Sequence, residues 1–126
     1  MPTEIAIPLE NKPGTLAKVS EVLGNAGVNL EGIGYGSGAR GVLRVIPSNV
    51  EAALAALKKA KIKAKKPQEV LETRIADAPG ALAGVARKLA KARVNVEAFY
   101  VVGEASGQLR CVFAVDNLAK AKSVLG

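Results

Sequence analysis

The sequence predicts an α+β protein built from two copies of one βαββαβ unit, and three observations support this prediction. The stretch NKPGTLAKV, Asn11 to Val19, returns 66 residues later as DAPGALAGV, Asp77 to Val85. Apolar residues alternate along some segments and recur every three or four residues along others, as strands and helices require. The apolar content of 49% is mostly aliphatic, with two Phe, two Tyr and no Trp, which suits helices packed on a sheet. Two related domains are therefore expected.

The first copy contains all six elements of the unit. Ile5, Ile7 and Leu9 alternate with other residues as in a half-buried strand, and a helical period follows the Pro-Gly pair. Ser48 with Glu51 has the spacing of a capping box. The expected elements are, in order, a strand at residues 5–9, a helix at 16–26, strands at 28–35 and 41–46, a helix beginning after Ser48, and a lysine-rich edge strand at 61–66.

The second copy repeats the first five elements. The expected elements are strand 69–76, helix 80–91, strands 94–102 and 107–115, and helix 116–125 with Asp116 as its cap. GQLRCV, Gly107 to Val112, aligns with GVLRVI, Gly41 to Ile46. The predicted domains are residues 1–66 and 67–126, the second without a clear final strand. We expect its first strand to have an open edge, covered by the lysine-rich strand or by another subunit.

The predicted order of elements is that of the ferredoxin-like fold, in which two helices cover one face of an antiparallel sheet. The absence of histidine and the single cysteine remove the common transition-metal sites and the Ser-His and Cys-His nucleophile pairs. Cys111 lies in the strand-like QLRCVFAV and is expected to pack in the core. The sequence therefore predicts no enzyme, no catalytic residue, no metal and no cofactor.

The Pro-Gly pair predicts a small-molecule site at the start of each first helix. Pro13 sets φ there, and Gly14 permits an unusual backbone angle without a Cβ in the way. The N–H groups of Gly14, Thr15 and Leu16 are expected to point outward and to accept a small anion such as a carboxylate. Asn11 adds an acceptor and a donor, which together match the carboxylate and ammonium of an α-amino acid. Taken alone, a single Pro-Gly pair is also common turn and cap chemistry.

The two stretches ENKPGTLAKVSEVLGNAGVNLEGIGY and ADAPGALAGVARKLAKARVNVEAFYV resemble the ACT domain, a ferredoxin-like regulatory module that commonly binds amino acids. The resemblance is greatest to the serine-binding regulatory domain of phosphoglycerate dehydrogenase. It implies that Asn11 and the Gly14 backbone form one half of a site and that Asn29 of a neighbouring domain forms the other. Because Leu9 and Ile75 stand where that domain has a polar ligand contact, serine specificity is not expected.

In the second copy the resemblance places Asp77, Gly80, Ala81 and Asn95 at the matching positions. A carboxylate at residue 77 can hold an ammonium but repels a carboxylate, so this site is expected to prefer a different ligand or to be structural. The resemblance as a whole implies a tandem protein, a homodimer, that binds an amino acid and reports it to an enzyme or regulator on a separate chain.

Two other functions compete with this interpretation. The net charge of +7 and the lysines in KKAKIKAKK, Lys58 to Lys66, suit a ferredoxin-like nucleic-acid-binding protein, although strand 42–46 lacks the aromatic residues that stack on bases. GSGARG, Gly36 to Gly41, fits a dinucleotide fingerprint but precedes a strand, so a hairpin loop that folds over a ligand is preferred. Without an apolar run of about 18 residues or a signal peptide, the chain is expected to be cytoplasmic and not to cross a membrane.

Overall fold

The computed structural model describes residues 2–37 and 41–125, and the chain divides into two compact units. One unit comprises Thr3–Gln68 and the other comprises the rest of the described chain. Each unit is described by itself below. Both have antiparallel sheets with two helices, which confirms the predicted α+β class and the tandem arrangement.

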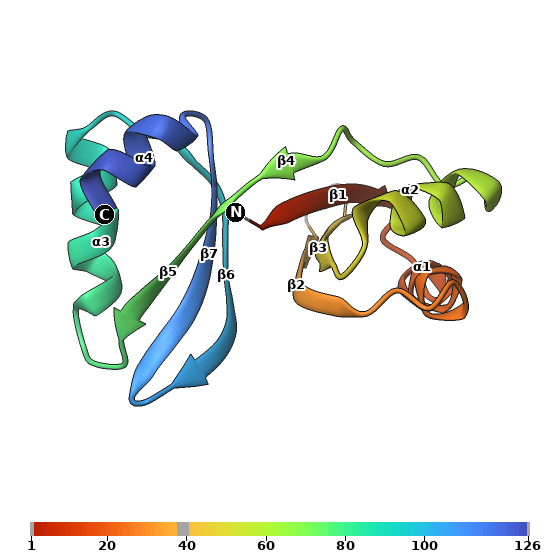
Figure 1. Cartoon of the computed structure of the whole chain (residues 1–126), viewed down its shortest axis with the longest axis horizontal. Helices are drawn as coiled ribbons and strands as arrows, with labels where there is room; N and C mark the ends of the chain where they lie inside the picture. Colours follow the sequence, from red (N-terminus) through yellow and green to blue (C-terminus); the bar gives the residue numbers. More distant parts are fainter. Residues whose placement is uncertain (1, 38–40, 126) are drawn as a thin grey trace. The chain divides into compact units, whose positions relative to one another are not determined.

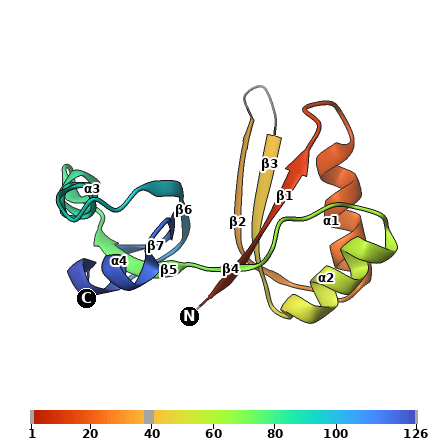
Figure 2. The ribbon, with the colours of Figure 1, turned by 90° about the horizontal axis from the view of Figure 1, so that it is seen from above.

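The first unit is a complete βαββαβ unit. Its elements are β1 (Thr3–Leu9), α1 (Thr15–Asn25), β2 (Leu30–Ser37), β3 (Gly41–Pro47), α2 (Val50–Lys59) and β4 (Gln68–Glu69), the last of which spans the boundary between the units. The strands lie in the order β2-β3-β1-β4, and β1 and β2 both pair antiparallel with β3. Figure 2 shows α1 and α2 together on one face of this sheet. This is the ferredoxin-like topology that the sequence predicts.

The second unit has the same order of elements up to its second helix. Its elements are β5 (Leu71–Ala76), α3 (Ala81–Lys91), β6 (Val96–Ala105), β7 (Gln108–Val115) and α4 (Leu118–Leu125). The three strands lie in the order β5-β7-β6, and all pairs are antiparallel. Figure 1 shows α3 and α4 on one face of this sheet.

Each unit has its own aliphatic core between sheet and helices. In the first unit the core consists of Ile5, Ile7, Leu9, Val19, Leu23, Val28, Leu43, Val45, Ala53 and Leu57. In the second it consists of Leu71, Ile75, Leu89, Val94, Cys111, Phe113, Val115 and Ala121. The Phe99 and Phe113 rings lie 4.8 Å apart at a tilt of 48°, an arrangement that aromatic pairs favour. The strand alternation and helical period seen in the sequence correctly predict these core residues, but Leu16 and Leu82, the first apolar residues of the two helical patterns, are exposed.

The predicted edge strand at residues 61–66 is wrong. Residues 62–67 form no strand, and the final strand of the first unit is the two-residue β4 further along the chain. The lysine-rich segment runs beside β1, where the Lys65 amide donates to the Ala6 carbonyl at 2.9 Å. Residues two apart on a strand turn their backbone groups to the same side, so Pro8 also faces this segment. Proline has no N–H, so Pro8 cannot supply the next donor that a regular ladder would need here.

The lysine-rich segment adds no strand to the sheet of β5, so that part of the expectation is wrong, and cover by another subunit stays a prediction. Lys65 bonds to Ala6, in its own unit, whereas β5 pairs only with β7 among the described residues.

Both predicted helix caps are displaced by one residue. The Asn49 side chain accepts from the Ala52 amide at 3.0 Å, and the Asn117 side chain accepts from the Lys120 amide at 3.0 Å. The predicted caps, Ser48 and Asp116, instead bond to the chain entering the second strand of each unit. Ser, Asp and Asn all suit an N-cap, so composition alone does not separate neighbouring candidates.

The alignment of Gly107–Val112 with Gly41–Ile46 is also wrong, by two residues. Ile5 pairs with Val45, whereas its counterpart Leu71, 66 residues on, pairs with Phe113, 68 residues on from Val45. The hairpin of the second unit is therefore two residues longer, and it contains a register shift between Val101 and Gly103. Cys111 is thus the structural counterpart of Leu43, and both are buried.

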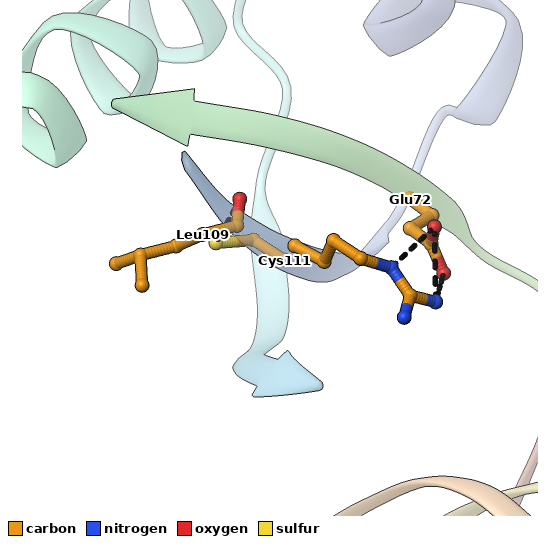
Figure 3. A network of polar contacts seen from close by, with 4 residues as sticks. Glu72, Leu109 and Cys111 are labelled. Atoms are coloured by element: carbon orange, nitrogen blue, oxygen red, sulfur yellow. Dashed lines mark hydrogen bonds and ion pairs between the residues drawn. The ribbon is translucent and has the colours of Figure 1, made fainter. Parts of the chain in front are cut away.

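Two ion pairs lie on the sheet faces opposite the helices. In the first unit, Arg44 Nη1 is 2.7 Å from Glu4 Oε1, and the Glu4 side chain is 1% exposed. In the second unit Arg110 contacts both carboxylate oxygens of Glu72 at 3.3–3.5 Å, and both side chains are about one third exposed (Figure 3). The two ion pairs do not occupy equivalent positions. Arg44 pairs with Ala6 across the first sheet, and the residue in the same position of the second sheet is Val112, which pairs with Glu72.

Candidate functional site

The loop between the first strand and first helix has the same backbone geometry in both units. In the first unit the Lys12 amide donates to the Glu10 carbonyl at 2.9 Å, and the Lys18 amide donates to the Gly14 carbonyl at 3.0 Å. In the second unit the Ala78 amide donates to the Ala76 carbonyl at 2.9 Å. The bond from Gly84 to Gly80, at 3.1 Å, completes the same pattern. The repeated sequence motif therefore specifies a repeated conformation.

Glycine is required at both helix entrances. Gly14 has φ 93° and Gly80 has φ 82°, a left-handed conformation that side chains with a Cβ rarely adopt. Neither helix has a side-chain cap. Among the residues that the structure describes, no acceptor bonds to the Leu16 and Ala17 amides, and these groups are free to bind an anion.

The side chains of the two loops differ more than their backbones. The Thr15 hydroxyl donates to the Glu10 carbonyl at 2.8 Å and lies 3.1 Å from the Lys12 carbonyl, so it braces the first loop. Its counterpart Ala81 has no hydroxyl. In the second loop the Asp77 amide donates to the Gly107 carbonyl at 3.2 Å, which ties that loop to the following hairpin.

An open groove of about 540 Å³ lies beside the first loop. Its walls come from the end of β1, the loop, the start of α1 and the segment that follows α2. The lining residues are Pro8, Leu9, Glu10, Lys12, Pro13, Gly14, Thr15, Lys18, Val19, Ile62 and Lys63. Leu9 and Val19 are buried and give the groove an apolar floor, and three lysines and one glutamate supply its charge. A groove of this kind can hold a small molecule with both apolar and charged parts.

Three of the sequence-predicted residues, Pro13, Gly14 and Thr15, line this groove. Asn11 is exposed and is not among the lining residues, and Leu16 is 43% exposed outside it. The matching residues of the second copy, Asp77, Gly80 and Ala81, are gathered at the entrance of α3. The predicted site residues thus lie at two separate helix entrances, one in each unit.

Asn29 and Asn95 lie immediately before β2 and β6, the strands at one end of each sheet. Their backbones are held by the turn that precedes the second helix, and both residues are exposed. Neither side chain has a partner within the described residues. Asn29 is not among the residues that line the groove of its own unit.

The residues that sequence reasoning missed are the charged ones. Lys12 and Lys18 lie inside the quoted motif, and Lys63 comes from the lysine-rich segment, yet the groove brings all three together. The sequence does contain one indication of a difference in charge between the loops. Lys12 and Lys18 of the first copy correspond to Ala78 and Gly84 in the second. The loop expected to fold over a ligand, GSGARG, includes residues 38–40, which lie outside the described residues.

Two further observations concern metal-binding groups and membrane-spanning helices. No group of three or more Cys, Asp and Glu side chains in residues 2–37 and 41–125 is arranged to hold a metal ion. None of the described helices combines the length and the apolar character that crossing a membrane requires.

Comparisons with known proteins agree with this architecture. The sequence profile of the family described as "ACT domain pair" matches residues 3–125. No curated protein sequence matches the chain. A crystal structure of a protein from Bacteroides thetaiotaomicron is similar, with a TM-score of 0.83 and 31% identity over 98% of this chain and 85% of that one.

Regulatory subunits of aspartate kinase share the fold at lower identity. The ligand-free crystal structure from Thermus thermophilus has a TM-score of 0.71 and 19% identity, covering 98% of this chain and 88% of that chain. The structure from Thermus flavus has a TM-score of 0.70 and 18% identity, covering 98% and 89%. At these identities the likeness shows the tandem fold alone.

Proposed function

The chain belongs to the ACT domain pair family, and from this premise we propose that it is a regulatory protein that binds an amino acid beside the Pro-Gly loop. The observation that carries the proposal is the groove next to Gly14, because it combines an apolar floor with charged groups at a helix entrance. The amides of Leu16 and Ala17 belong to the same helix entrance and have no acceptor among the described residues, so we take them as the donors that the ligand's α-carboxylate would reach. A regulatory role fits the likeness in fold to regulatory subunits that are chains of their own.

We propose further that a second domain completes the site. Asn29 is exposed next to β2, at the end of its sheet, so a neighbouring domain that aligns along this strand would bring an asparagine amide to the ligand. A homodimer supplies such a domain. Ligand binding would then favour the paired arrangement over the unpaired one, and a separate enzyme or regulator would respond to that change in population.

A thermal-shift screen against the twenty amino acids tests the proposal. A ligand at 100 times its dissociation constant adds about 2.7 kcal/mol to the free energy of unfolding, which a melting curve detects. Asn11→Ala and Asn29→Ala are expected to weaken binding without changing the melting temperature of the free protein. Asn25→Ala, an exposed asparagine at the far end of α1, is the matched control and should bind normally.

The same screen can contradict the proposal. If none of the amino acids raises the melting temperature of the wild-type protein, the Pro-Gly loops act only as helix entrances. A short RNA run in parallel at two salt concentrations tests the nucleic-acid alternative, because phosphate contacts to the lysines at 58–66 would weaken steeply with salt.

A further inference from the structure

The groove has more positively charged than negatively charged lining residues. Lys12, Lys18 and Lys63 line it, whereas Glu10 is the only acidic residue in its lining. Glu10 Oε2 lies 3.0 Å from Lys12 Nζ, so these two charges offset one another. Lys18 and Lys63 have no ion-pair partner within the described part of the chain. Two positive charges are therefore left to meet whatever enters the groove.

The positions of these two lysines are set by the fold. Lys18 lies on the first turns of α1, next to Val19, which is buried in the core. Lys63 lies between Ile62 and Ala64, which pack against the same core, and its own side chain is exposed. The nearby bond from the Lys65 amide to the Ala6 carbonyl holds this segment against β1. Lys18 and Lys63 therefore come from segments that are distant in sequence, and both segments pack against the core of the first unit.

We propose that this groove selects an acidic amino acid, aspartate or glutamate, over its neutral amide; the inference rests on the proposed function. Such a ligand has two carboxylates and one ammonium. The side-chain carboxylate meets Lys18 and Lys63, and the α-carboxylate and ammonium lie toward Gly14 and the Glu10–Lys12 pair, which line the same groove. The buried floor formed by Leu9 and Val19 accommodates the methylene groups. A neutral amino acid leaves the two lysines unmatched.

The second loop serves as an internal comparison. Its backbone hydrogen bonds match those of the first loop, but Ala78 and Gly84 replace Lys12 and Lys18, and Asp77 adds a negative charge. The two helix entrances therefore share their backbone groups and differ in the charges around them. Selection of an acidic ligand is assigned to the first loop alone.

Isothermal titration calorimetry with L-glutamate, L-glutamine, L-aspartate and L-asparagine tests the proposal on the full chain. Each acid and its amide have nearly the same shape, so the comparison isolates the charge. We expect the acids to bind at least tenfold more tightly than the amides, and the difference to shrink as salt is raised. Lys18→Gln and Lys63→Gln should each weaken glutamate binding roughly fivefold to tenfold and leave the amides unaffected. Lys120→Gln, an exposed lysine on α4, is the control and should change nothing.

The other outcomes separate this inference from the function on which it rests. If glutamine binds as tightly as glutamate and Asn11→Ala weakens both, the charge selection is overturned while amino-acid binding stands. If no amino acid binds, both the proposed function and the selection of acidic ligands are contradicted. If succinate or inorganic phosphate binds as tightly as glutamate, the groove is a general anion site and selection of an amino acid is overturned. If only a short RNA binds, the lysines serve a polyanion instead. Circular dichroism of each variant confirms that the exposed substitutions leave the fold intact.

Discussion

The backbone amide of Asn95 donates a hydrogen bond to Asp116 Oδ1 at 2.9 Å, and the Asp116 amide returns a bond to the Asn95 carbonyl at 3.1 Å. Asn29 and Ser48 make the same reciprocal pair in the first unit, at 3.0 and 2.7 Å. Each pair ties the start of the second strand to the start of the second helix. The backbones of Asn29 and Asn95, which we propose as ligand contacts, are thus held by a residue 19 or 21 positions further along.

Asp116→Ala is expected to lower the free energy of unfolding by about 1 kcal/mol, because the Asn95 amide loses its acceptor. Asp116→Asn should retain most of the stability, since its side-chain oxygen can accept the same bond. Urea denaturation measures both. Equal losses in the two variants would show that the negative charge, and not the hydrogen bond, is the stabilising feature.

The glycines of α3 offer a paired test of backbone conformation. Gly80→Ala should cost about 1 kcal/mol, because residue 80 has φ 82° and a Cβ strains that conformation. Gly84→Ala, one turn later in the same helix, should stabilise by roughly 0.5 kcal/mol, since alanine is the better helix former and no atom lies within 4 Å of the new Cβ. Thermal melts of the two variants should move in opposite directions, and a shared direction would contradict the assigned conformations.

The two ion pairs are expected to differ in their contribution to stability. Arg44→Ala should destabilise by about 3 kcal/mol, because it removes the guanidinium from a Glu4 carboxylate that is almost fully buried. Arg110→Ala should cost less than about 1 kcal/mol, since Glu72 and Arg110 are both partly exposed to solvent. Chemical denaturation of the two single variants provides the comparison. Similar losses would mean that burial of Glu4 does not raise the cost of removing its partner.

Cys111 is expected to react only when the second unit opens. The side chain is buried, its thiol donates to the Leu109 carbonyl at 3.7 Å, and burial raises the pKa of the Cys111 thiol above its ordinary value (Figure 3). A thiol reagent should therefore label the native protein far more slowly than the protein in denaturant. The sign of the pH effect follows, because above about pH 8.5 the unfolded thiol ionises while the folded one stays protonated, so stability should fall as pH rises. Cys111→Ala should remove that part of the pH dependence.

The sequence was sufficient to predict the fold because the repeat, the alternation and the helical period all indicate the same elements. The prediction of the helix cap was wrong because Ser48 and Asn49 are both suitable cap residues. The prediction of the edge strand was wrong because a contact with a distant part of the chain decides whether that strand forms. The lysine-rich segment alternates as a strand would, but it lies beside Pro8, which cannot donate to a regular ladder. Strand formation depends on the partner's backbone groups as well as on the segment.

The two-residue error in the hairpin alignment has a different cause. Side chains alternate between the two faces of a strand with a period of two, so a shift of two residues returns every side chain to the face it had before. Cys111 was correctly predicted to be buried even though its assumed counterpart was wrong. The pattern of burial cannot reveal such a shift, and only the pairing of β5 with β7 does.

The candidate site could be predicted only in part. The Pro-Gly motif indicates the loops, because glycine and proline determine the backbone there. The groove could not be predicted, since Lys63 approaches Lys12 and Lys18 only through the fold. Charges that converge from distant segments leave no local pattern.

The longer hairpin of the second unit determines how the two units can be recombined. Up to Gly32 and Ala98 the units correspond residue for residue at a spacing of 66, and beyond the hairpin they correspond at 68. A chimaera that crosses over before the hairpin can therefore carry the first loop, with its lysines, into the second unit without disturbing any strand pair. A crossover inside the hairpin would join strands of unequal length. Transplanting residues 10–18 onto residues 76–84 is accordingly the direct route to a protein with two matched helix entrances.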